Sequence, residues 1–462
     1  MWGKMRMHGG ITPVTHKAAT RDAAIRQFPF APLLLVPLLQ HAGRPALPVV
    51  SAGAGVERGA LLGRADGELS VAIHAPASGR VERIAPMPSS SGVMVPGVYL
   101  TPFPGSTQEI ACATPCDPDT ATAQEIIAAV QAAGIVGLGG AAFPTHAKLR
   151  LPPGRSVRLL IVNGAECEPY LTTDYRVMLE QAEDIVMGVR YLLKATGAAA
   201  AVLAVEDDAP EAAAAVMART PPALPFTSRV LPTRYPQGAE KLLIKALLGA
   251  EVPAGGLPID VGALCVNVAT VAEIGQLLPH GQGIQERIVT IAGPGISRPG
   301  NYRVPIGTPL RFALEHVGAR EELSLVFLGG PMMGQPLTSL DIPITKGTSG
   351  FIAFTHAETG QTRQVYPCIH CGRCVDACPL SLNPCELGVL ARHQQFQQMR
   401  DALHLDQCFE CGACAYVCPA QIPLVQEFRA AKAQLRRDAA RSRDTQAARG
   451  GTKPATGGGA DA

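Results

Sequence analysis

The sequence predicts a protein with an α/β core, β-rich segments on both sides of that core, and a small cysteine-rich domain near the C-terminus. Strand-like and helix-like patterns alternate between residues 117 and 285. Short apolar segments separated by Gly, Pro, Asp and Ser precede this core and return after it. Eight of the 13 cysteines stand in two runs of identical spacing. Together these observations predict four structured parts in one chain.

The composition is that of a folded protein without a strong charge bias. The chain has 462 residues, is 47% hydrophobic and carries a formal charge of +2, so net charge implies no nucleic-acid partner. The longest apolar stretch, 28–39, contains three prolines and is shorter than the roughly 20 residues that a membrane-spanning helix needs. Residues 1–17 lack the apolar segment of a signal peptide. We therefore expect neither a membrane-crossing helix nor a secretion signal.

The N-terminal part is predicted to be a turn-rich arm, 1–30, followed by a β-module, 31–116. The module has short strand patterns at Leu33–Pro37, Pro48–Val50, Ala60–Leu62, Val71–His74 and Gly79–Ile84. The segment from His74 to Val81 resembles the hairpin region of biotinyl and lipoyl β-sandwiches. The carrier lysine of those proteins is absent, because no lysine lies between Lys17 and Lys148. We interpret the module as structural.

The core, 117–285, reads as alternating helices and strands of a mostly parallel sheet. The expected helices are Thr120–Ala133, Asp174–Lys194, Ala209–Arg219, Lys241–Leu248 and Val271–Leu278. The expected strands are Arg158–Val162, Ala199–Val205, Arg229–Leu231 and Leu264–Val268. Strand-like patterns return in 286–355, where we expect strands near Val289–Ala292 and Leu325–Leu328. After the cysteine-rich domain, 356–430, we expect a short helix near Phe428–Arg443 within a basic, disordered tail, 431–462.

Two segments of the core carry candidate binding residues. The glycine-rich run from Gly137 to Lys148 lets backbone amides approach a ligand, and Lys148 adds a point charge for phosphate. Glu166 and Glu168 follow a predicted strand, where carboxylates suit ligand hydroxyls such as those of ribose. A glycine-rich loop alone is a weak signal, and a plain turn is the competing interpretation.

The two cysteine runs both have the form C-x2-C-x2-C-x3-C-P, which is the bacterial ferredoxin signature for two [4Fe–4S] clusters. The fourth cysteine of each run ligates the other cluster in such proteins. One predicted ligand set is therefore Cys368, Cys371, Cys374 and Cys418, and the other is Cys408, Cys411, Cys414 and Cys378. Zinc sites and disulfide frameworks have other spacings and contexts, and they match this doubled motif poorly.

The order of these motifs resembles the C subunit of the Rnf (Rsx) electron-transport complex over nearly the whole chain. The resemblance includes the arm at His8, the lysine-less sandwich, the glycine-rich loop, the segment Pro331–Gly334 and the doubled cysteine motif. The middle is similar to the NADH- and FMN-binding subunit of respiratory complex I. The resemblance implies a Rossmann-like FMN/NADH domain, a lipoyl-like β-sandwich, a β-grasp (SLBB-like) domain and a helical ferredoxin-like domain with two [4Fe–4S] clusters.

The resemblance to complex I also implies roles for individual residues. Gly137, Gly139, Gly140 and Lys148 correspond to the FMN phosphate loop, and Asn163, Asn267 and Thr270 to flavin or ribityl contacts. Phe143 corresponds to the stacking position near the nicotinamide, and Glu166, Glu168 and the Gly238–Glu240 segment to ribose and nicotinamide contacts. This chain departs from the complex I pattern at Leu138, Ala165 and Ala239, where that family has Arg, Asp and Glu.

The resemblance implies an electron-input subunit. NADH delivers two electrons as a hydride, whereas a cluster accepts one at a time, so a flavin must stand between them. The implied setting is the cytoplasmic face of the bacterial inner membrane. The implied partners are the A, B, D, E and G types of Rnf subunit, with ferredoxin reached through the complex, and the coupled process is ion transport. Two alternatives stay open: a soluble flavin and iron–sulfur reductase of the corrinoid-reductase kind, and an electron-carrying adaptor without a working flavin site.

Overall fold

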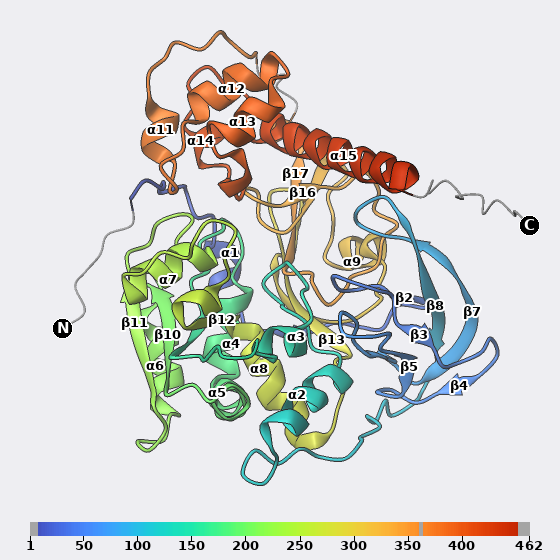
Figure 1. Cartoon of the computed structure of the whole chain (residues 1–462). Helices are drawn as coiled ribbons and strands as arrows, with labels where there is room; N and C mark the ends of the chain where they lie inside the picture. The colour runs from blue at the N-terminus through green and yellow to red at the C-terminus, as the bar shows by residue number, and fades with distance from the viewer. Residues whose placement is uncertain (1–7, 360–363, 451–462) are drawn as a thin grey trace, which may run out of the picture. The chain divides into compact units, whose positions relative to one another are not determined.

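The computed structural model describes residues 8–359 and 364–450 (Figure 1). The chain divides into two units: unit 1 contains the described residues 12–359, and unit 2 contains the described residues 8–11 and 364–450. Within these described ranges, no helix combines the length and the apolar character that crossing a bilayer requires.

The N-terminal part of unit 1 is a β-sandwich of two antiparallel sheets, with strand orders β2-β8-β7-β4 and β3-β5-β6 (Figure 1). Side chains such as Leu34, Val98 and Leu62 of the two sheets share one apolar core. The sequence analysis missed β8, because Pro96 and Gly97 interrupt its apolar pattern. The strands are β2 Leu34–Pro37, β3 Leu47–Pro48, β4 Gly55–Val56, β5 Leu61–Arg64, β6 Ile73–His74, β7 Gly79–Pro88 and β8 Met94–Pro102.

The α/β domain of unit 1 is built on a parallel sheet of order β11-β10-β9-β12 (Figure 1). Successive strand residues point to opposite faces. Leu160 therefore joins the core under α5 and α8, whereas Ile161 packs with Leu243 of α7. The predicted α/β layer is confirmed, with helices on both faces of the sheet.

The elements of this domain have the following bounds. The strands are β9 Leu159–Asn163, β10 Ala200–Glu206, β11 Phe226–Leu231 and β12 Ala263–Asn267. The helices are α2 Ala123–Ala132, α3 Thr145–Leu149, α4 Thr173–Glu180, α5 Ala182–Thr196, α6 Pro210–Ala218, α7 Glu240–Leu248 and α8 Val268–Leu277, with 3-10 turns η1 Pro258–Val261 and η2 Leu278–His280.

Three helix predictions in this domain were wrong in detail. The helix expected over Thr120–Ala133 is α2, which begins three residues later, at Ala123, after the N-cap Thr122. The single helix expected over Asp174–Lys194 is two helices, because α4 packs on α6 and α8 while α5 runs along α8, and the chain changes direction at Gln181. The last helix, α8, begins three residues earlier than expected, at Val268. Asn267 is its N-cap and accepts hydrogen bonds from the amides of Ala269 and Thr270.

The remainder of unit 1 is a mixed sheet of order β1-β14-β13-β17-β15-β16. The hairpin β13-β14 and the pairs β15-β16 and β15-β17 are antiparallel, whereas β13 and β17 are parallel, which gives the connectivity of a β-grasp fold. The sixth strand, β1, comes from the predicted N-terminal arm and pairs in parallel with β14. The elements are α1 Ala18–Arg21, β1 Arg26–Gln27, β13 Glu286–Ala292, β14 Gly300–Pro305, α9 Leu310–His316, β15 Leu323–Leu328, β16 Gln335–Pro336, β17 Gly350–Thr355 and α10 His356–Thr359.

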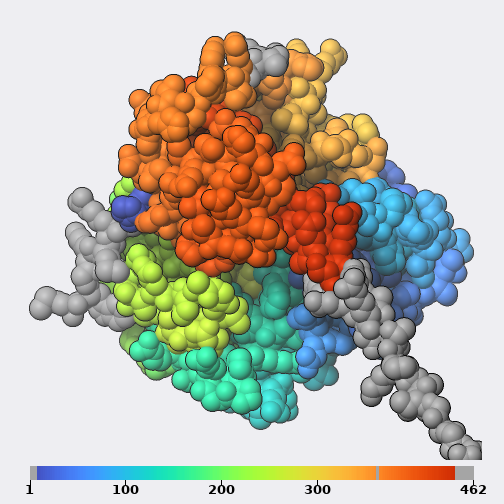
Figure 2. Space-filling model, turned by 45° about the horizontal axis from the view of Figure 1, so that its top comes forward, coloured from blue at the N-terminus to red at the C-terminus, as the bar shows by residue number. Residues whose placement is uncertain are grey.

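Unit 2 is a small helical domain, and its residues 364–450 are drawn in orange to red in Figure 2. Its elements are α11 Arg373–Ala377, α12 Pro384–Arg392, α13 Phe396–Asp401, η3 Leu405–Gln407, α14 Ala413–Tyr416 and α15 Leu424–Gly450. The prediction of a disordered tail from residue 431 was wrong as far as Gly450, because α15 is a 27-residue helix that is anchored by the buried side chains of Leu424, Val425 and Phe428. The rest of the predicted tail, 451–462, lies outside the described residues.

Candidate functional site

The two cysteine runs fold into the same local structure in unit 2. In the first copy, His370 and Gly372 have positive φ, and the amide of His370 donates to Cys368 Sγ at 3.4 Å. In the second copy, Glu410 and Gly412 have positive φ, and the amide of Glu410 donates to Cys408 Sγ, also at 3.4 Å. Each loop thus turns its backbone amide toward the first sulfur of its run.

The first predicted ligand set lines one cavity. Cys418, from the second run, joins the three cysteines of the first, and the remaining lining is mostly apolar. Four sulfur donors around one small cavity fit an iron–sulfur cluster. A fifth thiol, that of Cys385, lines the same cavity and was given no role by the motif. The four predicted ligands there are Cys368, Cys371, Cys374 and Cys418.

The second predicted set also crosses between the two runs. Burial, followed by the nearby thiols of Cys411, Cys408 and Cys378, raises the pKa of Cys414. This electrostatic interaction places Cys378 of the first run beside the three leading cysteines of the second. The exchange of fourth cysteines that the spacing predicts is therefore compatible with the geometry of both groups.

The polar residues predicted for the α/β domain gather at one edge of its sheet. Strands β9, β10 and β11 are added in one direction, and β12 returns to pair with β9 on the other side. Asn163 and Asn267 are register partners at the carboxyl ends of β9 and β12. In open α/β sheets, ligands bind outside the carboxyl ends of the strands where the strand order reverses. This edge therefore has the position of a ligand site.

The glycine-rich loop lies against this edge. A Cβ on Gly139 would lie 3.4 Å from the Cβ of Asn267, so the loop passes close to the end of β12. The amide of Leu138 donates to the buried hydroxyl of Thr270 at 2.9 Å, which fixes the loop on α8. Gly140 has φ +111°, and a Cβ added there would meet no atom within 4 Å. Its backbone is therefore accessible to a ligand, and the residues fit a phosphate-bearing cofactor.

Two further contacts join the predicted residues. Lys148, in the last turn of α3, forms an ion pair of 2.6 Å with Glu240 in the first turn of α7. Asn163 Nδ2 donates to the carbonyl of Gly238 at 2.9 Å. A Cβ on Gly238 would lie 2.2 Å from the carbonyl oxygen of Ala165, so only glycine allows this approach. Phe143 is exposed.

The two glutamates after β9 have other partners. The Glu166 carboxylate accepts hydrogen bonds from the amides of Asp174 and Tyr175 at the start of α4, and burial with the Asp174 charge raises its pKa. The Glu168 carboxylate accepts from the amides of Met332 and Met333, and burial raises its pKa to about 7. Both side chains are thus held by backbone amides of other segments.

Sequence reasoning missed two charged residues at this edge. The Asp174 carboxylate accepts a hydrogen bond of 2.7 Å from Asn267 Nδ2. Arg287 is buried and donates to the carbonyl of Leu138 at 2.7 Å, while its Nε and Nη1 have no hydrogen-bond partner among residues 8–359 and 364–450. Neither residue stands in a motif, and only their proximity in the fold reveals them.

Comparison with known families finds a match for each of the four structured parts. Residues 5–102 match the RnfC barrel sandwich hybrid domain, and residues 130–276 match the Nuo51 FMN-binding domain. Residues 288–336 match the SLBB domain, and residues 367–422 match the 4Fe-4S dicluster domain. The residue bounds that the sequence predicted for the domains stay predictions.

The chain is 42% identical to the C subunit of the ion-translocating oxidoreductase complex of Rhodobacter capsulatus over 434 residues, which are 93% of this chain and 83% of that protein. It is 38% identical to the C subunit of the proton-translocating ferredoxin:NAD(+) oxidoreductase complex of Clostridium ljungdahlii, over 93% of each chain. The chain belongs to the family of Rnf-complex C subunits. The predicted resemblance to this family is confirmed.

A further relative is the C subunit of the Na(+)-translocating ferredoxin:NAD(+) oxidoreductase complex of Acetobacterium woodii, which is 36% identical over 84% of this chain and 88% of that protein. Among solved structures, the NAD+-reducing [NiFe]-hydrogenase in the H2-reduced state is 20% identical, with a TM-score of 0.47 over 71% of this chain and 68% of that chain. The matched family models indicate that the chain carries an FMN-binding domain and an iron–sulfur dicluster domain.

Proposed function

We propose that this chain is the peripheral electron-input subunit of a membrane-bound, ion-translocating oxidoreductase. It takes a hydride from NADH at an FMN site and passes single electrons through two [4Fe–4S] clusters to partner subunits. The observation that carries this proposal is that one chain holds both a polar strand edge where an α/β sheet reverses its order and two groups of four thiols. FMN, when bound, converts a two-electron hydride into the single electrons that clusters require.

The residues at the strand edge would hold FMN. Gly139 and Gly140 allow backbone amides to approach the phosphate, and Lys148 adds a positive charge beside it. Asn163 and Asn267 face the same edge from neighbouring strands and would contact the flavin or ribityl group. The supporting residues are Gly137 and Thr270, which shape the loop, and Gly238, which lets the turn after β9 approach α7.

Binding of NADH would use the exposed ring of Phe143 for stacking and nearby carboxylates for orientation. Glu240 is the best placed of these, because it is half-exposed and already next to Lys148. Glu166 and Glu168 are partly buried and are held by backbone amides, so we assign them to shaping the turn that receives the nicotinamide or ribose. No general acid or nucleophile is required, because positioning accounts for hydride transfer.

The thiols of unit 2 would ligate the clusters in two crossed sets. We assign Cys368, Cys371, Cys374 and Cys418 to one cluster and Cys408, Cys411, Cys414 and Cys378 to the other. Changing Cys418 to Ala tests this assignment, because it should remove the cluster of the first run and lower bound iron from about eight to about four atoms. Cys112→Ala, outside both sets, is the matched control. If the spectroscopic signal of the cluster held by the second run were lost instead, the crossed arrangement of ligands would be contradicted.

The partners would be the membrane subunits of an Rnf complex, of types A, B, D, E and G, with ferredoxin reached through them. The relatives' names describe ferredoxin:NAD(+) oxidoreductase complexes that move protons or Na+. We therefore propose a place on the cytoplasmic face of the inner membrane and coupling of NADH–ferredoxin electron exchange to ion transport. Co-purification with those subunits tests this assignment, and a chain that is recovered only in soluble form with full activity would favour a free reductase.

The central experiment is anaerobic. The full chain is reconstituted with iron, sulfide and FMN, NADH is added, and the absorbance of flavin and clusters is recorded. Loss of both absorbances supports the path from NADH through FMN to the clusters. Clusters that form while no flavin binds and NADH has no effect would overturn the dehydrogenase role and leave an electron-carrying adaptor.

A further inference from the structure

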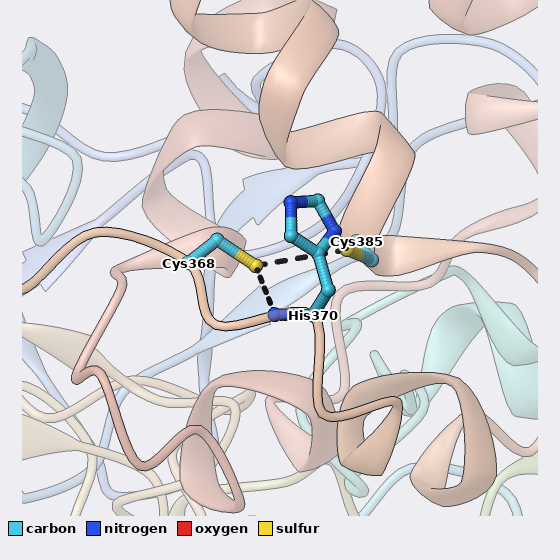
Figure 3. Close-up of side chains that lie close together, drawn as sticks. All are labelled: Cys368, His370 and Cys385. Carbon is cyan, nitrogen blue, oxygen red and sulfur yellow. Dashed lines mark hydrogen bonds between the residues drawn. The ribbon is translucent and has the colours of Figure 1, made fainter.

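A fifth thiol stands beside the cluster site of the first cysteine run. Cys385, in the first turn of α12, has its Sγ 3.7 Å from Cys368 Sγ and 3.7 Å from His370 Nδ1 (Figure 3). Figure 3 shows the three side chains converging, with Cys385 approaching from the helix and the other two from the motif loop. Cys385 also lines the cavity that the four predicted ligands share.

The second copy of the motif offers no such group. The two copies are offset by forty positions, as Cys368 and Cys408 show, and α12 corresponds to the start of α15. The counterpart of Cys385 is therefore Val425, a buried apolar residue whose side chain has no hydrogen-bond donor. Within the described residues, both sites have a hydrogen bond from a backbone amide to the first sulfur of the run. Only the first site has a thiol, that of Cys385, where the second has Val425.

The direction of the hydrogen bond follows from the chemistry of a ligand. A cysteine that ligates iron is a thiolate, which accepts and does not donate. The proton between the two sulfurs must then belong to Cys385. Nδ1 of His370 is a competing acceptor, but a hydrogen bond to a charged acceptor is roughly twice as strong as a bond between neutral groups. The S–H of Cys385 is therefore directed to Cys368.

We propose that Cys385 is a positioning residue that is not a ligand but donates an S–H hydrogen bond to Cys368 and raises the reduction potential of the cluster held by the first cysteine run. The role rests on the proposed function, in which Cys368 ligates that cluster. A reduced cluster carries one more negative charge than an oxidised one, so a donor next to its ligand sulfur stabilises the reduced form more. Hydrogen bonds to the sulfurs are among the known determinants of cluster potential.

The test uses the full chain reconstituted anaerobically, as wild type and as the variants C385A, C385S and C112A. Iron and sulfide contents report cluster occupancy, and a redox titration followed by electron paramagnetic resonance reports the potential of each cluster. Coupling of the cluster spin to an exchangeable proton reports the hydrogen bond itself. The exposed Cys112 accepts a hydrogen bond from Gln282 in unit 1, so C112A controls for the loss of a thiol elsewhere.

We expect C385A to keep the iron content of wild type, to shift the potential of one of the two clusters to a more negative value, and to lose one exchangeable-proton coupling. C385S, which keeps a donor, should shift that potential less, and C112A should shift neither. Full iron content with both potentials unchanged in C385A overturns the role of Cys385 alone. Loss of about half the iron in C385A also overturns it, since Cys385 would then be a ligand. A wild type that holds no clusters overturns the proposed function as well.

Discussion

Asn163 and Asn267 end two neighbouring parallel strands as register partners, and each side-chain amide is held by a different part of the α/β domain. Asn163 donates to the carbonyl of Gly238 at 2.9 Å, and Asn267 donates to the Asp174 carboxylate at 2.7 Å. The pair thus ties the start of α7 and the start of α4 to the edge where the sheet reverses. The shape of the proposed FMN site depends on these two amides.

Replacing Asn267 with Ala should weaken both the fold and FMN binding. The change removes the N-cap of α8 and leaves the partly buried Asp174 carboxylate without its amide partner. A lost N-cap costs about 1 kcal/mol, and an unpaired buried acceptor adds roughly 1–3 kcal/mol. Thermal unfolding and the flavin content of the purified chain measure the two effects.

Thr122→Ala is the matched control for this variant. Thr122 caps α2 through a capping box with Glu125 and lies far along the chain from the strand edge. We expect a loss of about 1 kcal/mol in stability with flavin content unchanged. If both variants lose flavin equally, FMN binding follows general stability and the special role of Asn267 is wrong.

Replacing Lys148 with Ala should reduce FMN affinity without a large effect on folding. Its ion pair with Glu240 is partly exposed, and such pairs contribute about 0–1 kcal/mol to stability. A charged contact to phosphate is worth roughly 1.5–3 kcal/mol, which corresponds to about a 10- to 150-fold change in the dissociation constant. Fluorescence titration of the flavin-free chain with FMN measures this dissociation constant. Lys245→Ala breaks a similar ion pair with Glu251 and should leave FMN affinity intact.

Stability should depend on pH through Glu206. This carboxyl is buried, and burial raises its pKa from 4.5 to about 7. The hydrogen bond from the Arg234 amide and the positive charge of Lys17 act in the opposite direction and lower the pKa. The folded state then binds more protons than the unfolded state between these two values. Its stabilising contribution is complete below about pH 4.5 and is lost as the pH rises through about 7.

The difference in unfolding free energy between wild type and E206Q isolates this group, because the other buried acids are present in both proteins. Denaturant unfolding from pH 4.5 to 8 should show wild type losing up to roughly 3 kcal/mol relative to E206Q. The exposed Glu183→Gln should show no comparable change relative to wild type. A pH-independent difference between wild type and E206Q would mean that the pKa of Glu206 is not raised in the folded state.

Replacing Gly9 with Ala should destabilise unit 2 and its cluster site. Gly9 has φ +66°, and an added Cβ would lie 2.4 Å from the carbonyl oxygen of Cys378. The neighbouring amide of Gly10 donates to the carbonyl of Ala377 at 2.9 Å. The strained backbone at residue 9 and the displaced Cys378 carbonyl should lower the free energy of unfolding by roughly 1–3 kcal/mol. We also expect faster release of iron from the cluster site to a chelator.

Gly53→Ala separates backbone strain from the contact with Cys378. Gly53 has φ +84° with nothing within 4 Å of the added atom, so its substitution costs only the strain, about 1–2 kcal/mol. Iron release from G53A should match wild type. Equal iron release from G9A and wild type would show that the contact does not support the cluster.

Local chemistry explains why much of this protein could be predicted from the sequence. The cysteine spacing predicts the two ligand sets, because three thiolates of one tight loop reach one cluster and the fourth lies too far along the chain. The strand expected at Arg158–Val162 was recognisable as an apolar run, because both faces of β9 are covered by apolar side chains. These signals act over a few residues and need no knowledge of distant segments.

Features that depend on contacts between distant segments emerged only from the folded chain. The arm strand Arg26–Gln27 joins a sheet nearly 280 residues away through its pairing with Tyr302 and Arg303. The carboxylates of Glu166 and Glu168 are bound by amides of other segments, and Cys385 reaches Cys368 from a separate helix. The order of residues establishes which chemical groups are present and how they are spaced. Packing establishes which of them meet, because most buried polar groups form a hydrogen bond with a partner that the chain brings within reach.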